Sequence, residues 1–522
     1  DTLIGGFGDD TLIGGDGDDT LIGGGGADFV VGGVGSDVLE LDGSVGVTGE
    51  GGEGADTVHL VGETNDASLS GVETVFGSAG EDSLTITTSD IETVSGGDGY
   101  DVVTLTDTVG NTVELAGVEV VTGSDGADVL TVTDGTSVTL AGGEGGDTLI
   151  GGFGDDTLIG GDGDDTLIGG GGADFVVGGV GSDVLELDGS VGVTGEGGEG
   201  ADTVHLVGET NDASLSGVET VFGSAGEDSL TITTSDIETV SGGDGYDVVT
   251  LTDTVGNTVE LAGVEVVTGS DGADVLTVTD GTSVTLAGGE GGDTLIGGFG
   301  DDTLIGGEGS DVLVGGPDDG VPGLDADVAV FTGSKGSYEF GVDASSGSLT
   351  VTSKETGSID VVEGIETLSF DDGPLSISQA ADKIFFVSQL SVPLDLEVGD
   401  HVEFVLTGLD GFDEGVAVSV DLSSEADIGT LGETLHSEIL ALAADSSLEV
   451  LIDPEDPGSG ITFRSPEEFE VSLSHVSHAI EGITSTIVES SEQPAAPEGE
   501  AGQAESSEQP AAPEGEAGQA ES

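Results

Sequence analysis

Aspartate recurs every nine residues near the start of the chain, at Asp10, Asp19, Asp28 and Asp37. Each of these residues follows a glycine-rich stretch and precedes an aliphatic residue by two positions, as in Gly5–Ile13, which reads GGFGDDTLI. Carboxylates and backbone carbonyls are the oxygen donors that a hard cation such as Ca²⁺ prefers. The residue types and their spacing therefore predict a series of repeated cation sites.

The elements that would position these carboxylates can be inferred from one nonapeptide. Glycines at its first, second and fourth positions allow positive φ, so six residues can form a tight turn with inward-pointing carbonyls. The last three residues alternate about one aliphatic side chain, which indicates a short strand. Turn and strand repeated without a pause predict a solenoid. Equivalent aspartates on successive coils would repel each other unless a cation lay between them.

The pattern G-G-x-G-x-D-x-U-x, where U is aliphatic, resembles the calcium-binding nonapeptide of the RTX (repeats-in-toxin) proteins, which form parallel β-rolls. Four contiguous copies in residues 5–40 carry this resemblance. It implies an all-β fold in which two nonapeptides form one coil and calcium lies between turns stacked on the same side. Asp10 would then share a site with Asp28, and Asp19 with Asp37.

The sequence contains two long identical blocks. Residues 1–146 recur unchanged as 147–292, and a third copy begins at Asp293 and diverges after Gly307. Within a block the aspartate spacing widens after Asp37, and in some turns, such as Gly77–Asp82, Ser replaces the second glycine. Strand-like runs rich in Val, Thr, Leu and Ile lie between these turns. We expect one β-roll over residues 1–316, with wider coils in which some turns are plain.

The predicted calcium ligands are the motif aspartates and the second and fourth glycines of the first four turns. The aspartates are Asp10, Asp19, Asp28, Asp37, Asp56, Asp82, Asp101, Asp128, Asp147, Asp156, Asp165, Asp174, Asp183, Asp202, Asp228, Asp247, Asp274, Asp293, Asp302 and Asp311. The glycines are Gly6, Gly8, Gly15, Gly17, Gly24, Gly26, Gly33 and Gly35. We expect Asp302 and Asp311 to end the array.

The charge balance supports bound cations. The 522 residues include 106 acidic and 4 basic ones, for a formal net charge of −102, and the first basic residue is Lys335. No Lys or Arg can therefore pair with a carboxylate in residues 1–334, and the uncompensated charge opposes compaction. Such a chain is not expected to bind nucleic acid or anionic lipid, and no apolar run is long enough to cross a membrane. The absence of Cys excludes disulfides and thiolate metal sites.

Three different segments follow the array. Residues 317–373 resemble the flank that closes RTX rolls and predict a C-terminal β cap. Residues 374–488 predict a small β-rich module with one helix, Leu431–Ala444, loosely similar to repeated modules of large bacterial surface proteins. Residues 489–522 contain two copies of a 16-residue repeat without aliphatic residues larger than Ala after Val488, so we expect them to be disordered.

These features predict a secreted calcium-binding structural protein of the bacterial cell surface or extracellular matrix, in a surface layer, filament or adhesin stalk. Its expected partners are calcium ions, further copies of itself and cell-surface polysaccharide. The alternative is the export and folding region of a secreted protease or lipase. Catalysis by this chain is not expected, because its acids lie on repetitive turns without a unique constellation. We interpret His59 and His205, one in each block, as strand residues.

The turns admit three further alternatives. A flexible glycine-rich linker would not keep an aliphatic residue in phase with the aspartate, whereas a metal-free β-solenoid would. A phosphate-binding loop would need a G-K-[ST] motif, which does not occur. Because the chain begins in the middle of a repeat, we expect it to be a piece of a longer protein.

Overall fold

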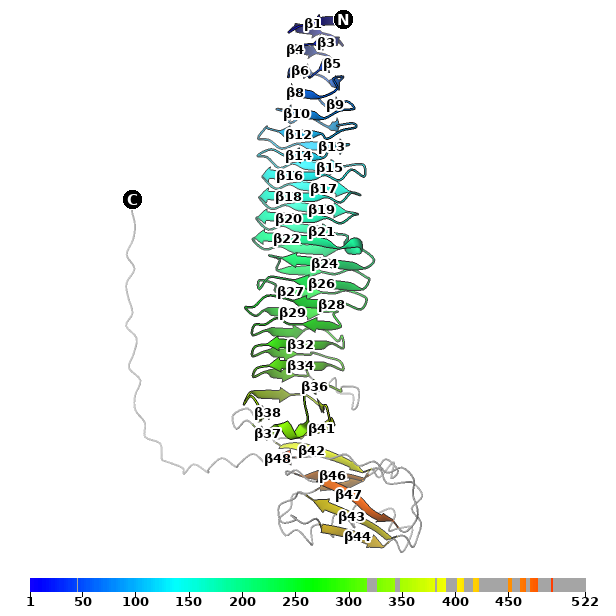
Figure 1. Ribbon diagram of the computed structural model, residues 1–522, viewed down its shortest axis with the longest axis vertical. Coiled ribbons are helices and arrows are strands. Elements are labelled where there is room, and N and C mark those ends of the chain that lie inside the picture. The colour runs from blue at the N-terminus through cyan, green and yellow to red at the C-terminus, as the bar shows by residue number, and fades with distance from the viewer. Residues whose placement is uncertain are drawn as a thin grey trace, which may run out of the picture.

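The computed structural model describes residues 1–44, 46–316, 326–342 and 348–380, together with seven strands between residues 383 and 491. Over residues 1–316 the chain forms a long rod of stacked coils whose strands run across the long axis (Figure 1). The predicted all-β, parallel β-solenoid is thus confirmed. In the described residues no helix is long and apolar enough to cross a membrane.

One wall of the rod is a parallel sheet of odd-numbered strands, each paired with the next odd strand. These strands are β1 (Thr2–Phe7), β3 (Thr20–Gly25), β5 (Val38–Asp42), β7 (Thr57–Leu60), β9 (Thr74–Phe76), β11 (Thr93–Ser95), β13 (Thr112–Ala116), β15 (Val129–Val132), β17 (Thr148–Gly152), β19 (Thr166–Gly170), β21 (Val184–Leu187), β23 (Thr203–Leu206), β25 (Thr220–Phe222), β27 (Thr239–Ser241), β29 (Thr258–Ala262), β31 (Val275–Val278), β33 (Thr294–Ile296) and β35 (Val312–Val314).

The opposite wall is a parallel sheet of even-numbered strands. These strands are β2 (Thr11–Asp16), β4 (Phe29–Val34), β6 (Val47–Glu53), β8 (Asn65–Ser70), β10 (Asp82–Ile86), β12 (Val102–Leu105), β14 (Val120–Thr122), β16 (Thr139–Glu144), β18 (Thr157–Asp162), β20 (Phe175–Val180), β22 (Val193–Glu199), β24 (Asn211–Ser216), β26 (Asp228–Ile232), β28 (Val248–Leu251), β30 (Val266–Thr268), β32 (Thr285–Glu290), β34 (Thr303–Glu308) and β36 (Val328–Val330). A short 3-10 helix, η1 (Gly189–Val191), precedes β22.

The register confirms that two nonapeptides form one coil. Thr2 pairs with Thr20 in one sheet and Thr11 pairs with Phe29 in the other, so equivalent residues are 18 positions apart. Several strands, such as β2, are longer than the three residues predicted for them, because the ladder continues through the first residues of the next turn, as in the pairing of Gly15 with Gly33. In these coils, half of the expected turn is therefore also sheet.

The core is a double row of aliphatic side chains between the two sheets. The residue two positions after each motif aspartate points inward, and Leu21, Val30 and Leu39 are fully buried. The row continues through the wider coils and into the second block without a break. Because every coil adds its aliphatic residues to the same row, burial of apolar surface favours stacking at each step.

The wider coils keep the same two walls. Strands β10, β12, β13 and β15 lie where the Val-rich and Thr-rich runs predicted them. His59 lies on β7 with its ring stacked on Phe76 at 5.0 Å between centroids, and His205 stacks in the same way on Phe222. Both histidines are therefore exposed strand residues, as interpreted from the sequence.

Antiparallel strands cover the end of the solenoid. After η2 (Lys335–Ser337), strands β37 (Tyr338–Val342) and β38 (Leu349–Ser353) form a hairpin that pairs with β39 (Ile359–Glu363), and β39 continues the wall of β35 in parallel. Strand β40 (Thr367–Phe370) continues the other wall and pairs with β41 (Gly373–Ala380). The rings of Phe331, Tyr338, Phe340 and Phe370 pack together with centroids 5.4–6.0 Å apart.

Seven further strands follow β41. They are β42 (Lys383–Leu390), β43 (His401–Thr407), β44 (Val416–Asp421), β45 (Glu449–Ile452), β46 (Ile461–Ser465), β47 (Glu470–Val476) and β48 (Ser490–Ser491). Strand β42 pairs with β41, β46 and β48, while β43 pairs with β44 and β47. The predicted helix Leu431–Ala444 and the tail from residue 492 onward lie outside the described residues.

Candidate metal centre

The glycine-rich turns leave no room for side chains between coils. All eight glycines predicted as ligands have φ between +96° and +143°, a region that residues with a Cβ rarely adopt. A Cβ added to Gly24 would lie 2.0 Å from the carbonyl oxygen of Gly6, and one added to Gly26 would lie 2.2 Å from that of Gly8. The carbonyls of the second and fourth glycines therefore face the same positions of the next coil.

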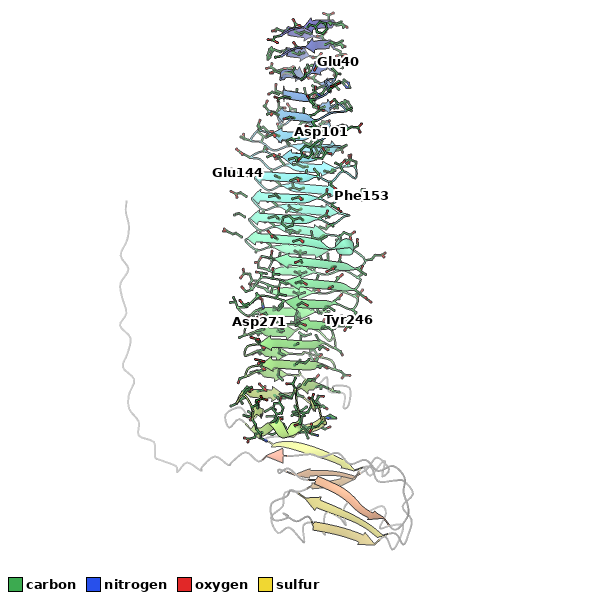
Figure 2. All side chains as sticks on the ribbon, viewed as in Figure 1. Glu40, Asp101, Glu144, Phe153, Tyr246 and Asp271 are labelled. Atoms are coloured by element: carbon green, nitrogen blue, oxygen red, sulfur yellow. The ribbon has the colours of Figure 1, made fainter. Side chains whose placement is uncertain are left out.

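The motif aspartates form two columns, one along each edge of the rod. Figure 2 shows side chains projecting from both edges, with Glu144 at one edge and Phe153 at the other. Within a run of aspartates, the backbone N–H of one donates to Oδ1 of the next, at 2.9 Å from Asp10 to Asp28 and 2.8 Å from Asp19 to Asp37. The structure thus brings together both pairs expected to share a site.

The second carboxylate oxygen of these aspartates is buried and has no hydrogen-bond partner. Asp37 and Asp56 are 1% and 0% exposed, yet their Oδ2 atoms accept no hydrogen bond. A buried carboxylate oxygen without a donor or cation is strongly disfavoured. The same holds for Oδ2 of Asp10, Asp19, Asp28, Asp101, Asp147, Asp156, Asp165, Asp174, Asp183, Asp202, Asp247 and Asp293.

Burial also changes the acidity of these groups. The pKa of Asp147 and of Asp165 is raised to about 6, chiefly by loss of solvation and also by the negative charge of neighbouring aspartates, against the hydrogen bond that each Oδ1 accepts from a backbone N–H. The pKa of Asp101 and of its second-block copy Asp247 is also raised to about 6, chiefly by burial. Ionised carboxylates at these positions therefore need a positive charge, and residues 1–334 contain no Lys or Arg to supply it.

The oxygen atoms around Oδ2 fit calcium. A Cβ added to Gly14 would meet Oδ2 of Asp19 and the carbonyl oxygen of Gly32 on the next coil, each at 2.5 Å, so oxygens of two coils converge there. In the described residues, no three His, Asp or Glu side chains gather into a metal cluster. The groups that converge there are a carboxylate oxygen and a backbone carbonyl oxygen, and such oxygen donors suit a hard cation.

Four of the predicted aspartates differ from the rest, and all four lie in turns whose second residue is Ser. Oδ2 of Asp82 accepts the backbone N–H of Ser78 at 2.6 Å, and Oδ1 accepts the Ser78 hydroxyl at 3.1 Å. Oδ1 also accepts the side-chain amide of Asn65 from the preceding coil. The copies are Asp128, Asp228 and Asp274, each with its own Ser and Asn. Both oxygens of these carboxylates are therefore already hydrogen-bonded within the chain.

Glutamates that end individual runs of aspartates were not predicted from the sequence. Oε2 of Glu73 accepts the N–H of Asp56 at 2.6 Å, and Oε2 of Glu119 accepts that of Asp101 at 2.7 Å. Burial raises the pKa of Glu73, and the neighbouring Asp56 charge adds to the shift against a backbone hydrogen bond. The segments Val-Glu-Thr-Val and Val-Glu-Val-Val contain these glutamates. Each glutamate meets its aspartate only because the coil between them has 17 or 18 residues, and no sequence motif gives this coil length.

The column also extends beyond the predicted last aspartates, so the expectation that Asp302 and Asp311 end the array was wrong. The N–H of Asp302 donates to Oδ1 of Asp327 at 2.8 Å, and that of Asp311 donates to Oδ1 of Asp360 at 3.0 Å. Burial raises the pKa of Asp360 to about 6. Each of these aspartates precedes an aliphatic residue by two positions, a signal hidden by the long insertions before them.

Comparison with protein families supports the interpretation of the turns as calcium-binding turns. The model of the RTX calcium-binding nonapeptide repeat (4 copies) matches residues 1–39, 139–167, 150–185 and 287–321. A search of curated proteins matches none. The matched segments are those with uninterrupted nine-residue spacing, and the structure shows that the segments between them continue the same coils. RTX repeats are typical of proteins secreted by the type I pathway. The chain therefore carries RTX calcium-binding nonapeptide repeats, which form a β-solenoid and bind several Ca²⁺ ions in their Asp-rich turns.

Proposed function

We propose that the protein is a secreted structural rod that folds when it binds calcium outside the cell. The observation that carries this proposal is the pair of buried aspartate columns, with free Oδ2 atoms, along a solenoid whose first 334 residues contain no Lys or Arg. Self-repulsion of these columns opposes the fold until cations bind. Folding of the rod is therefore tied to the calcium concentration of its surroundings.

The free Oδ2 atoms and the glycine carbonyls are the proposed ligands. Each aspartate uses Oδ1 to accept an N–H from the previous coil and keeps Oδ2 for the cation, so one side chain both sets the register and binds. The Gly carbonyls complete the donor set from the turns above and below. Bound Ca²⁺ supplies positive charge between coils that otherwise present only negative groups.

This division of roles suits export as an unfolded chain. At low calcium, carboxylate repulsion and the conformational entropy of 100 glycines favour the unfolded state. Outside the cell, sites of extracellular type bind calcium with dissociation constants on the order of 10⁻⁴–10⁻³ M. The binding free energy then becomes folding free energy, and stacked coils fold cooperatively because each contacts only its neighbours.

The two identical blocks favour a structural role at the bacterial surface or in the extracellular matrix, in a layer, filament or stalk. Strands β17–β32 repeat β1–β16 in order, so a second block lengthens the rod without adding a new kind of surface. We propose self-association and cell-surface polysaccharide as partners in this role, and no catalysis by this chain. Its buried acids occupy repeated positions, whereas an active site needs a unique constellation.

The experiment that tests the proposal is a calcium titration followed by far-UV circular dichroism, with magnesium as the control cation. We expect a cooperative transition from coil to β-structure in the millimolar range that magnesium does not reproduce, because Mg²⁺ demands shorter, octahedral coordination. Electron microscopy at saturation should then show rods. A chain that is already folded in chelator would contradict the proposal. A catalytic segment in the same polypeptide would instead favour the export region of a secreted enzyme.

A further inference from the structure

The Ser-containing turns are built differently from the glycine turns around them. In the turn Gly223–Asp228, Ser224 donates its backbone N–H to Oδ2 of Asp228 at 2.7 Å and its hydroxyl to Oδ1 at 3.1 Å. Asp228 is 1% exposed. The oxygen that stays without a partner in the glycine turns is therefore occupied from within the same turn.

An asparagine on the preceding coil faces each of these aspartates. Asn211 donates its side-chain amide to Oδ1 of Asp228 at 2.6 Å and to the Ser224 hydroxyl at 3.0 Å. In a glycine column the equivalent neighbour is a second aspartate, as with Asp183 before Asp202. Asparagine thus replaces a negative carboxylate by a neutral group that donates hydrogen bonds.

We define an Asn–Ser–Asp junction as such a triplet, and the described residues contain four. They are Asn65 with Ser78 and Asp82, Asn111 with Ser124 and Asp128, Asn211 with Ser224 and Asp228, and Asn257 with Ser270 and Asp274. In all four, Ser N–H reaches Oδ2 at 2.6–2.7 Å and Asn Nδ2 reaches Oδ1 at 2.5–3.0 Å.

We propose that the four Asn–Ser–Asp junctions bind no calcium and join their coils without it. The Asn amide and the Ser N–H and hydroxyl take the place of the cation at a buried carboxylate. A calcium ion at Oδ2 would have to compete with the Ser N–H for that oxygen. Asp82, Asp128, Asp228 and Asp274 are thereby removed from the calcium ligands predicted from the sequence, although they match the motif.

The position of the junctions divides the array into separate calcium-dependent runs. In the first block, Asn65 and Asp82 join β8 to β10 in one wall, and Asn111 and Asp128 join β13 to β15 in the other. Each wall of each block therefore contains one interface that calcium does not control. This inference rests on the calcium-dependent rod proposed above, because it concerns which of its interfaces are cation sites.

The test counts bound ions before and after the junctions are converted to the glycine pattern. One variant of the full chain combines Ser→Gly at residues 78, 124, 224 and 270 with Asn→Asp at residues 65, 111, 211 and 257. Equilibrium dialysis at saturating calcium should show four more ions per chain than in the wild type, one per junction. Equal ion counts would overturn the proposal, as would a variant that cannot fold in calcium, since Asn and Ser would then not be standing in for a cation.

Two further variants test the proposal by removing carboxylates and counting the calcium ions that are lost. Asp82→Asn with Asp228→Asn should leave the number of bound ions unchanged, whereas the matched control Asp101→Asn with Asp247→Asn, whose Oδ2 atoms are free, should lose at least two. Loss of ions in both pairs would overturn the proposal. These outcomes differ from failure of the proposed function itself, in which the wild-type chain would not fold on addition of calcium.

Discussion

At the scale of single residues, the two oxygens of each motif carboxylate have separate tasks. Oδ1 of Asp165 accepts the N–H of Asp147 at 2.7 Å, and Oδ2 of Asp165 has no partner. The first contact needs only an acceptor, which an amide oxygen also provides, whereas the second position needs negative charge to bind a cation. Replacement by Asn therefore separates the structural task from the metal-binding task.

We predict that Asp19→Asn combined with Asp165→Asn raises the calcium concentration at the midpoint of folding by several-fold. Both residues are buried with free Oδ2 atoms, and loss of a charged ligand weakens an oxygen site. The matched control is Asp16→Asn with Asp162→Asn, which removes the same charge from exposed turn positions. Calcium titrations by circular dichroism would contradict the prediction if the two pairs of substitutions shifted the midpoint equally.

A pH dependence follows from the raised pKa values of the buried aspartates. The pKa of Asp147, Asp156 and Asp293 in the metal-free fold is raised to about 6, mainly by burial, above the ordinary value of 3.8. A raised pKa means that the folded state binds protons more tightly than the unfolded state. The stability that this proton binding adds is complete below about pH 4 and is lost as the pH rises through 6. We predict that calcium-depleted protein gains β-structure between pH 7.5 and pH 4.5. A signal that grew with rising pH would contradict this.

Protons and calcium then compete for the same oxygens. Below about pH 6, binding of calcium must displace protons from groups such as Asp147. The calcium midpoint should therefore rise as the pH falls from 7 to 5, even though the calcium-depleted protein becomes more structured over the same range. Titrations at several pH values with circular dichroism would measure both effects, and a midpoint that stayed constant would exclude the competition.

At the scale of elements, the stacked strands depend on the aliphatic rows independently of calcium. Leu39 and Leu185, copies of each other, are 0% exposed. We predict that Leu39→Ala with Leu185→Ala costs about 2–5 kcal/mol per site and lowers the melting temperature in saturating calcium. The controls Val34→Ala and Val180→Ala alter residues that are 48% exposed and should change the melting temperature little. Differential scanning calorimetry would contradict the prediction if both pairs of substitutions lowered the melting temperature equally.

The walls and the calcium turns could be predicted from the sequence because their signals are local. Asp28 and Val30 lie two positions apart within one nonapeptide, and the phase is visible wherever the spacing is nine. The junctions could not be predicted, since Asn65 and Asp82 meet only when a coil of 17 residues brings them into register. Glu73 and Asp360 were missed for the same reason: their roles depend on which residue one coil away lies beside them.

At the scale of the whole molecule, each block adds a fixed length to the rod. A block contributes sixteen strands, eight to each wall, and neighbouring strands lie about 4.8 Å apart, which gives roughly 38 Å per block. Because the blocks are identical, deleting residues 147–292 joins Gly146 to Asp293 in the same sequence context as Gly146 and Asp147. Strand β34, which follows the point of deletion, pairs with β32 in the same register in which β18 pairs with β16. After the deletion β34 can therefore pair with β16 in that register.

We therefore predict that this deletion shortens the calcium-saturated rod by about 38 Å while its cross-section stays the same. The remaining coils keep their neighbours and their cation sites, so the calcium midpoint should change little. Small-angle X-ray scattering gives length and cross-section separately, and the full chain in chelator is the control for an unfolded state. A shortened chain that fails to fold, or whose length stays unchanged, would mean that the two blocks do not stack end to end as one solenoid.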